Sequence, residues 1–291
     1  MQIRDILAAK QTFSLEIFPP RKEMSVAAAR EISRQMEAET HPDWISVTFS
    51  AGGSGNSENT IKISSDIANS PSSTTSLAHL TCFGSSTKDV DAYAEAALAA
   101  GVENILALRG DRAPGRSIID FAYAEDLVRY LKERHPELCV GAACYPEGHV
   151  EQMDPAKDLD YLKRKVDAGV DFLVTQLFFD NEDFYRFRER LDRIRIKVPV
   201  VVGIMPFTST RQIQKMAFSC GASIPAKVIK YLAQAGDSEE AQRQAGVDYA
   251  IEQLEDLSAN GVDGLHIYSM NKPEVARATY RALCQCGYIK K

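Results

Sequence analysis

The segment DPAKDLDYLKRKVDAGVDFLVTQLFF, residues 154–179, holds one helix and one strand in direct succession. Asp154 suits an N-cap, the predicted helix Pro155–Ala168 begins with proline, and Gly169 follows its end. The apolar run 172–178 predicts a strand that is covered on both faces. A helix that leads into such a strand is typical of parallel α/β folds.

The same alternation recurs along the whole chain. Further helices are predicted over residues 23–39, 88–100, 123–134 and 181–196. The predicted strands are residues 12–18, 44–49, 77–82, 104–108, 139–144, 172–178, 198–204 and 264–268. Eight units in 291 residues give about 36 residues per unit, which suits a single (β/α)8 TIM barrel over residues 1–291. A doubly wound sheet is disfavoured because no G-x-G-x-x-G turn follows the first strand, and residues 52–55 are predicted to form a flexible loop.

Composition narrows the class of partner. Hydrophobic residues make up 45% of the chain, and 34 Lys and Arg oppose 40 Asp and Glu, for a net charge of −6. This balance predicts a globular cytoplasmic protein with no nucleic-acid or membrane partner, and favours a small-molecule ligand. The six cysteines lack the paired spacing of a zinc or iron–sulfur site, so no metal is expected.

Barrel chemistry lies at the carboxyl ends of the strands and in the loops that follow them. The connections 110–122 and 145–154 are longer than the usual two to six residues, which favours a binding function there.

Glu16 lies within the first predicted strand. Strand alternation places it on the same face as Ser14 and Phe18. Burial disfavours the charged form of a carboxyl group, so Glu16 could donate a proton to a leaving group. An ion pair with a nearby arginine such as Arg21 explains the same residue equally well.

Arg109, Gly110 and Asp111 follow the fourth predicted strand. Gly110 permits close approach of a ligand, Arg109 could bind it in a bidentate manner, and Asp111 could accept hydrogen bonds. A local pair between Arg109 and Asp111 is the alternative.

Three further polar residues lie near predicted strand ends. Gln176 can both donate and accept hydrogen bonds, which suits the edge of a heterocycle. Gln176, His79 and Thr48 would equally serve as hydrogen-bonded polar residues of the core.

Asp158, Tyr161 and Lys165 recur at helical spacing after the fifth strand, with Arg164 beside them. Such a stripe usually marks a solvated helix face. A phosphate-bearing ligand could also use it, although Lys165 would lie about 15 Å from the helix start.

Seven motifs together resemble one family. They are FSLEIFPPR (13–21), SVT (46–48), HLTC (79–82), ALRGD (107–111), YPE (145–147), LKRKVDAG (162–169) and TQLFFD (175–180). In this order they resemble methylenetetrahydrofolate reductase of the short bacterial type, from about residue 13 to Asn271.

The resemblance implies an FAD-dependent barrel enzyme. Such an enzyme transfers hydride from NADH or NADPH to flavin, then to 5,10-methylenetetrahydrofolate, and yields 5-methyltetrahydrofolate for methionine synthesis or another one-carbon pathway. Glu16 matches the general acid that protonates the departing ring nitrogen. Asp111 matches the acidic residue near flavin and pterin, and Gln176, Asp111 and Lys272 match substrate-binding positions. The positions similar to those lining FAD are Thr48, His79, Arg109, Gly110, Asp111, Tyr123, Ala124, Tyr145, His149, Asp158, Arg164 and Lys165.

The sequence also departs from the family pattern. Thr210 stands where some members place an aromatic side chain that stacks on substrate or nucleotide, and Tyr161 stands where others carry an amide. We expect no C-terminal regulatory domain. We also expect the protein to form a homo-oligomer.

Two other functions remain open. The chain could be the flavin subunit of an electron-transfer complex with an iron–sulfur partner. A cofactor-independent barrel lyase ranks last, because Schiff-base chemistry needs a strand lysine and the predicted strands contain none.

Overall fold

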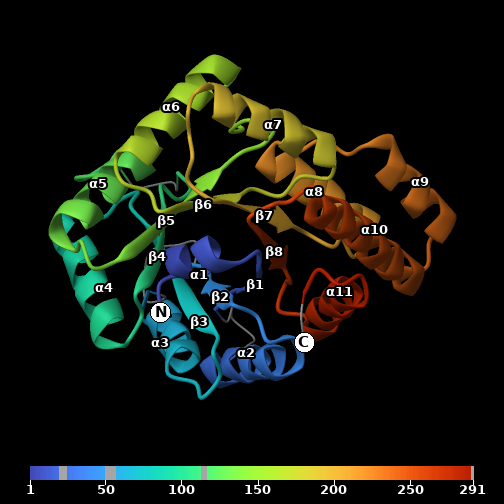
Figure 1. Ribbon diagram of the computed structural model, residues 1–291, viewed down its shortest axis with the longest axis horizontal. Helices are drawn as coiled ribbons and strands as arrows, with labels where there is room; N and C mark the ends of the chain where they lie inside the picture. The colour runs from blue at the N-terminus through green and yellow to red at the C-terminus, as the bar shows by residue number, and fades with distance from the viewer. Residues whose placement is uncertain (20–24, 50–56, 113–116, 290–291) are drawn as a thin grey trace.

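The computed structural model describes residues 1–19, 25–49, 57–112 and 117–289, and it confirms the predicted (β/α)8 barrel (Figure 1). Eight parallel strands close in sequence order, because β8 pairs with β1. The strands are β1 (Thr12–Ile17), β2 (Trp44–Val47), β3 (Thr75–Thr81), β4 (Asn104–Leu108), β5 (Cys139–Cys144), β6 (Phe172–Thr175), β7 (Val200–Ile204) and β8 (Gly264–Tyr268).

The helices surround this barrel, with α1 as an exception (Figure 1). They are α1 (Ile3–Ala9), α2 (Val26–Thr40), α3 (Ser57–Ala68), α4 (Thr87–Ala99), α5 (Ala124–Arg134), α6 (Pro155–Asp167), α7 (Asn181–Arg193), α8 (Thr210–Cys220), α9 (Ala226–Ala235), α10 (Glu239–Ala259) and α11 (Pro273–Gln285). The connection from β7 to β8 carries α8, α9 and α10, so the extra length of the chain lies chiefly there.

Local signals place the elements well. The bounds of β4, β5 and β8 are those predicted, and α6 begins at Pro155 with the Asp154 side chain accepting from the backbone N–H groups of Ala156 and Lys157. Strand β6 ends at Thr175, three residues before the prediction. The apolar residues Leu177 and Phe179 beyond it pack instead with Met205 and Phe207 in a separate cluster.

Helix α1 was not predicted, and it closes one end of the barrel. Ile3 and Leu7 pack with Trp44 and Phe172, which project inward from β2 and β6. The backbone N–H of Ile3 donates to Asn104 Oδ1 over 2.8 Å. This end of the interior is therefore apolar and sealed, and α1 lies across the barrel in Figure 1.

Alternation along each strand divides its side chains between two environments. On β1, Phe13, Leu15 and Ile17 belong to the outer core beneath the helices. Ser14 and Glu16 share the other face of the strand, as predicted, and this face points into the barrel. Glu16, the later of the two residues along β1, therefore lies inside the barrel and further from α1 than Ser14 does.

Two glycines shape the interior. A Cβ atom on Gly141 would lie 2.5 Å from the Phe172 ring, and one on Gly203 would lie 2.6 Å from Tyr268 and from the Thr175 carbonyl oxygen. Both glycines are therefore needed because a large aromatic side chain from another strand fills the space beside them.

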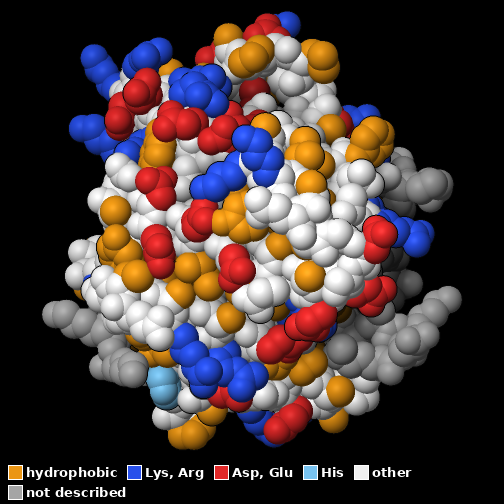
Figure 2. All heavy atoms as spheres, turned by 90° about the vertical axis from the view of Figure 1, so that its right-hand side faces the viewer, with side chains coloured by type: hydrophobic (Ala, Val, Ile, Leu, Met, Phe, Trp, Pro, Cys, Tyr) orange, Lys and Arg blue, Asp and Glu red, His pale blue; other side chains and the backbone are white. Residues whose placement is uncertain are grey.

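The outer surface carries no single-sign field on the side formed by α9, α10 and α11. Figure 2 shows Lys and Arg interspersed there with Asp and Glu. Within the described residues, no helix has both the length and the apolar character needed to cross a bilayer.

Overpacking at Gly141 gives a first prediction. Gly141→Ala should lower the free energy of unfolding by about 1–3 kcal/mol, because the buried Phe172 ring must move. Urea denaturation measures this loss. A second change, Phe172→Leu, should recover part of it in a double-mutant cycle. Strictly additive losses would contradict the contact.

Candidate active site

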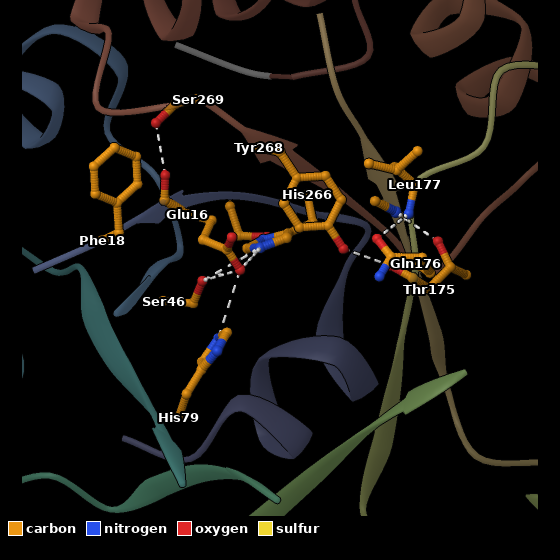
Figure 3. Close-up of polar contacts among 12 residues, drawn as sticks. Glu16, Phe18, Ser46, His79, Thr175, Gln176, Leu177, His266, Tyr268 and Ser269 are labelled. Carbon is orange, nitrogen blue, oxygen red and sulfur yellow. Dashed lines mark hydrogen bonds and ion pairs between the residues drawn. The ribbon is translucent and has the colours of Figure 1, made fainter. Parts of the chain in front are cut away.

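Glu16 lies at the centre of a polar cluster inside the barrel (Figure 3). Its Oε2 atom is 3.5 Å from Ser46 Oγ, 3.6 Å from His79 Nε2 and 3.8 Å from His266 Nε2. The Glu16 side chain is 21% exposed, whereas those of His79 and His266 are 7% and 2% exposed. Glu16 is therefore the member of the cluster that solvent or a ligand reaches.

The strand pairing explains this gathering. Glu16 is in register with Ser46 on β2 and with Tyr268 on β8, and His79 follows one strand further on β3. Parallel strands in register bring inward-facing side chains to the same level of the barrel. The cluster therefore depends on closure between β1 and β8.

His79 is uncharged in this environment. Burial lowers its pKa to about 4, against an opposing effect of Glu16. Its Nε2 atom has no hydrogen-bond partner among the described residues. A buried polar atom without a partner is a position at which a ligand could bind.

Tyr268 and Gln176 lie on the other side of the cluster (Figure 3). The Tyr268 hydroxyl donates to the Thr175 carbonyl oxygen over 2.6 Å, and burial raises the pKa of Tyr268 well above its usual value. Gln176 Oε1 accepts from the backbone N–H of Leu177 over 2.8 Å. This contact fixes the orientation of the Gln176 amide at the end of β6.

The loop after β8 contacts the end of β1 and the residues that follow it, beyond the last paired residues of these two strands. Asn271, with φ 56°, accepts from the Phe18 backbone N–H over 2.9 Å and donates to the Phe18 carbonyl oxygen over 3.0 Å. Ser269 Oγ donates to the Glu16 carbonyl oxygen over 2.6 Å. These side chains hold the backbone at Glu16 and at Phe18, two residues further on, and Lys272 follows as the N-cap of α11.

Arg109 forms its ion pair with Glu151 and not with Asp111, the partner considered from the sequence. Its guanidinium group forms two hydrogen bonds, of 2.6 and 2.8 Å, with Glu151 in the loop after β5, so the local pair with Asp111 is wrong. The hydrogen bonds to Glu151 are the largest cause of a raised pKa of Arg109, and Asp111 adds to it. Asp111 itself is exposed. Gly110 has φ 83° and approaches Thr81 closely.

The loop after β5 and the helix α6 form one side of the mouth. The Tyr145 and His149 rings meet edge to face at 4.7 Å, and Asp158 accepts from the His149 backbone N–H over 3.3 Å. Burial raises the pKa of Asp158 and, together with Arg109, lowers that of His149.

The stripe on α6 is not a uniformly solvated face. Lys165 is partly buried, its Nζ atom donates to the Ala143 carbonyl oxygen over 2.5 Å, and burial lowers its pKa. Tyr161 is 51% exposed, and Arg164 pairs with Glu125 over 3.0 Å. Lys165 therefore contacts the backbone of β5 instead of extending into solvent.

The remaining predicted residues lie around the same mouth. Thr48 follows β2 directly and its carbonyl oxygen accepts from Thr60 Oγ1. Tyr123 is 59% exposed and precedes Ala124, the first residue of α5. Arg21 and the loop 52–55 lie outside the described residues, so the pairing of Glu16 with Arg21 stays a hypothesis.

Sequence reasoning missed His266 and its contacts. Ser14 Oγ lies 2.8 Å from His266 Nδ1, and Ser46 Oγ lies 3.3 Å from His266 Nε2. The available signal was strand alternation, which places Ser14 and Glu16 on one face of β1 and His266 and Tyr268 on one face of β8. The missing information was that β8 lies beside β1.

A closed barrel with its titratable side chains gathered at the carboxyl ends of the strands defines a protein of the enzymatic barrel class. Residues 2–284 match the family described as methylenetetrahydrofolate reductase. The chain belongs to that family, and the resemblance seen in its motifs is confirmed.

Individual relatives agree with this assignment. The chain is 34% identical to 5,10-methylenetetrahydrofolate reductase of Escherichia coli, over 93% of this chain and 90% of that one. It is 34% identical to methylenetetrahydrofolate reductase (NADH) 1 of Zea mays, over 92% of this chain and 47% of that one. The chain thus spans less than half the length of the plant and fungal relatives that it matches.

A solved structure shares the fold. It is described as an uncharacterized protein from Clostridium thermocellum that binds two copies of 5-methyl-5,6,7,8-tetrahydrofolic acid. The TM-score is 0.63, the sequence identity is 15%, and 99% of each chain is covered.

The buried, neutral His79 gives a second prediction. In the unfolded chain this group binds a proton near pH 6.5, whereas in the folded chain it does so near pH 4. The unfolded state therefore binds more protons between these values, and stability falls as the pH falls through that window, by up to about 3 kcal/mol. His79→Gln should remove most of this loss.

Urea unfolding at several pH values between 4 and 7 measures the effect. His41→Asn, at an exposed position, is the control and should keep the wild-type dependence. An equally steep dependence in His79→Gln would count against a neutral buried His79.

Proposed function

We propose that this chain reduces 5,10-methylenetetrahydrofolate to 5-methyltetrahydrofolate, with electrons that pass from NADH or NADPH through bound FAD. The observation that carries the proposal is the position of Glu16 in a chain of this family. Its carboxyl group lies inside the barrel, partly exposed toward the mouth, with hydroxyl and imidazole groups as its neighbours.

Glu16 acts as the general acid in this proposal. Opening of the five-membered ring of the folate to a reactive iminium requires a proton on the departing nitrogen. Among the described residues, the side chains nearest the Glu16 carboxyl group are Ser46, His79 and His266, and none of them is a lysine or an arginine. The described neighbours fit this requirement, because the pKa of His79 is lowered by burial.

Substrate contacts are assigned to three residues around the mouth. Gln176 presents an oriented amide at the end of β6, which suits the donor and acceptor edge of a pterin. Asp111 lies exposed after β4, where its charge would stabilise the cationic iminium. Lys272, at the start of α11, suits a carboxylate of the substrate.

The residues on β2 to β6 and the adjoining loops fit a flavin dinucleotide. The Nε2 atom of buried His79, which has no hydrogen-bond partner in the described part of the chain, offers a polar contact at the base of the site. Arg109 and Arg164 lie at the mouth and on α6, and they suit a diphosphate once they exchange their partners Glu151 and Glu125. Further contacts are proposed for Thr48, Gly110, Asp111, Tyr123, Ala124, Tyr145, His149, Asp158 and Lys165. A bound flavin would supply hydride transfer between the nicotinamide nucleotide and the folate.

The relatives support the substrate and the donor. The Zea mays protein is named for NADH, and the Clostridium thermocellum protein is described as binding a reduced folate. We extend both properties to this chain as proposals. The methyl product would serve methionine synthesis or another one-carbon pathway in the cytoplasm, and the active form would be a homo-oligomer of single-barrel chains.

The whole reaction can be followed in one anaerobic cuvette. The purified protein should be yellow, lose its visible absorbance with NADH or NADPH, and regain it when methylenetetrahydrofolate is added. A protein that a reduced iron–sulfur donor bleaches, but neither nucleotide does, would be an electron-transfer subunit instead. A colourless protein that takes up no added FAD would overturn the flavin assignment.

Glu16→Gln tests the general acid and is the third prediction. The variant should keep flavin and its reduction by the nucleotide, but lose folate reduction by about 10²-fold or more, because an amide cannot supply the proton. Rapid-mixing measurements separate the two half-reactions. Glu58→Gln, an exposed change on α3, should leave both unaltered. Equal losses in both half-reactions of Glu16→Gln would remove the general-acid role.

A further inference from the structure

His266 is a buried histidine with a serine hydroxyl at each ring nitrogen (Figure 3 shows it beside Glu16). Ser14 Oγ lies 2.8 Å from Nδ1, and Ser46 Oγ lies 3.3 Å from Nε2. Ser14 Oγ also donates to the Leu265 carbonyl oxygen over 3.1 Å, and Ser46 Oγ also lies 3.5 Å from Glu16 Oε2. The contacts form one chain from a backbone carbonyl to the Glu16 carboxyl group.

The backbone carbonyl sets the direction of this chain. A carbonyl oxygen can only accept, so the single hydroxyl hydrogen of Ser14 is donated to the Leu265 carbonyl oxygen. Nδ1 of His266 must then be the donor to Ser14. In a neutral ring Nε2 is therefore the acceptor, and Ser46 is the donor to it.

When each of the four contacts is a hydrogen bond, a count of hydrogens restricts the protonation state of the Glu16 carboxyl group. The four contacts need four hydrogens, and Ser14, neutral His266 and Ser46 supply three of them. The fourth comes from Glu16 when its carboxyl group is protonated and donates to Ser46. The alternative that also satisfies every contact is a carboxylate with a doubly protonated His266.

Burial decides between these two arrangements. His266 is 1% exposed, and separating a cation from an anion inside the barrel carries a large desolvation cost. The arrangement with both groups uncharged avoids that cost. Among the described residues, the other titratable groups that face Glu16 are His79 on β3 and Tyr268 on β8, and neither supplies a charge, since burial lowers the pKa of His79 and raises that of Tyr268.

We propose that Ser14, His266 and Ser46 form a directed hydrogen-bonded chain, anchored on the Leu265 carbonyl oxygen, that holds Glu16 as the neutral acid. His266, Ser14 and Ser46 are positioning residues, because they act through Glu16. The catalytic part of this inference rests on the proposed function, whereas the direction of the chain does not.

The chain also favours return of the proton after each turnover. When Glu16 gives its proton to the folate nitrogen, it becomes a carboxylate, and one of the four contacts loses its hydrogen. Uptake of a proton from solvent at the exposed side of Glu16 restores the full set. Glu16 therefore becomes protonated again while His266 keeps its protonation state.

The tautomer of His266 tests the chain directly, without flavin or folate. The protein contains five histidines, so ring ¹⁵N labelling with His266→Gln for assignment resolves its signals. We expect neutral His266 near pH 7 with the proton on Nδ1. A proton on Nε2 alone, or on both nitrogens, would overturn the proposal.

The pH profile of the folate half-reaction tests its consequence, and is the fourth prediction. Folate reduction needs protonated Glu16, so its rate falls on the alkaline side. Ser46→Ala removes the acceptor of the Glu16 proton. Ser14→Ala frees the His266 ring to place its proton on Nε2, which makes Ser46 a donor to Glu16. Both should move the alkaline limb to lower pH by about 0.5–1 unit, the effect of one net hydrogen bond.

Ser76→Ala is the matched control. Ser76 is a fully buried strand serine whose hydroxyl has no hydrogen-bond partner among the described residues, so its removal should leave the limb in place. A shift to higher pH in Ser46→Ala, or no shift in a folded Ser14→Ala, would overturn the chain. An unchanged pH profile in Glu16→Gln would mean that the alkaline limb does not come from Glu16. That result would overturn the proposed general acid, and the His266 tautomer would still test the hydrogen-bonded chain.

Discussion

Closure of the barrel between β1 and β8 is the constraint on which the site depends. Once the strands close, an inward-facing polar group is stabilised only by a partner inside the barrel or by access to the mouth. Helix α1 and the ring of Trp44 fill the opposite end, which leaves no place there for a carboxyl group. Glu16 lies one level above the apolar layer, where it meets hydroxyl and imidazole groups and still reaches the mouth.

The same constraint explains the glycines and the loop after β8. Tyr268 can turn inward because Gly203 on the neighbouring strand leaves the space for its ring. Beyond the last ladder bond, the Asn271 amide holds Phe18 where no further strand residue does. The backbone at and just after Glu16 is thus held by side chains of the loop after β8, which helps to define the position of its carboxyl group.

Much of the fold could be predicted because its signals are local. Period-two alternation placed Ser14 and Glu16 on one face, and Asp154 marked the start of α6. What could not be predicted depends on contacts between distant residues. The contact of Ser14 with His266 spans 252 positions, and that of Arg109 with Glu151 spans 42. Helix α1 has seven residues, too few for a clear periodic pattern, and is stabilised by the barrel end that it covers.

The two carboxyl groups assigned to the reaction occupy opposite environments. Glu16 lies inside the barrel beside Ser46 and the buried rings of His79 and His266, whereas Asp111 is exposed at the mouth next to the Arg109–Glu151 pair. The proposed chemistry needs a proton donor for the folate nitrogen and an anion for the iminium cation in the same step. One carboxyl group cannot do both, because donation of its proton and permanent negative charge exclude each other. We propose that the barrel separates the two tasks by depth, with the acid enclosed at Glu16 and the anion exposed to solvent at Asp111.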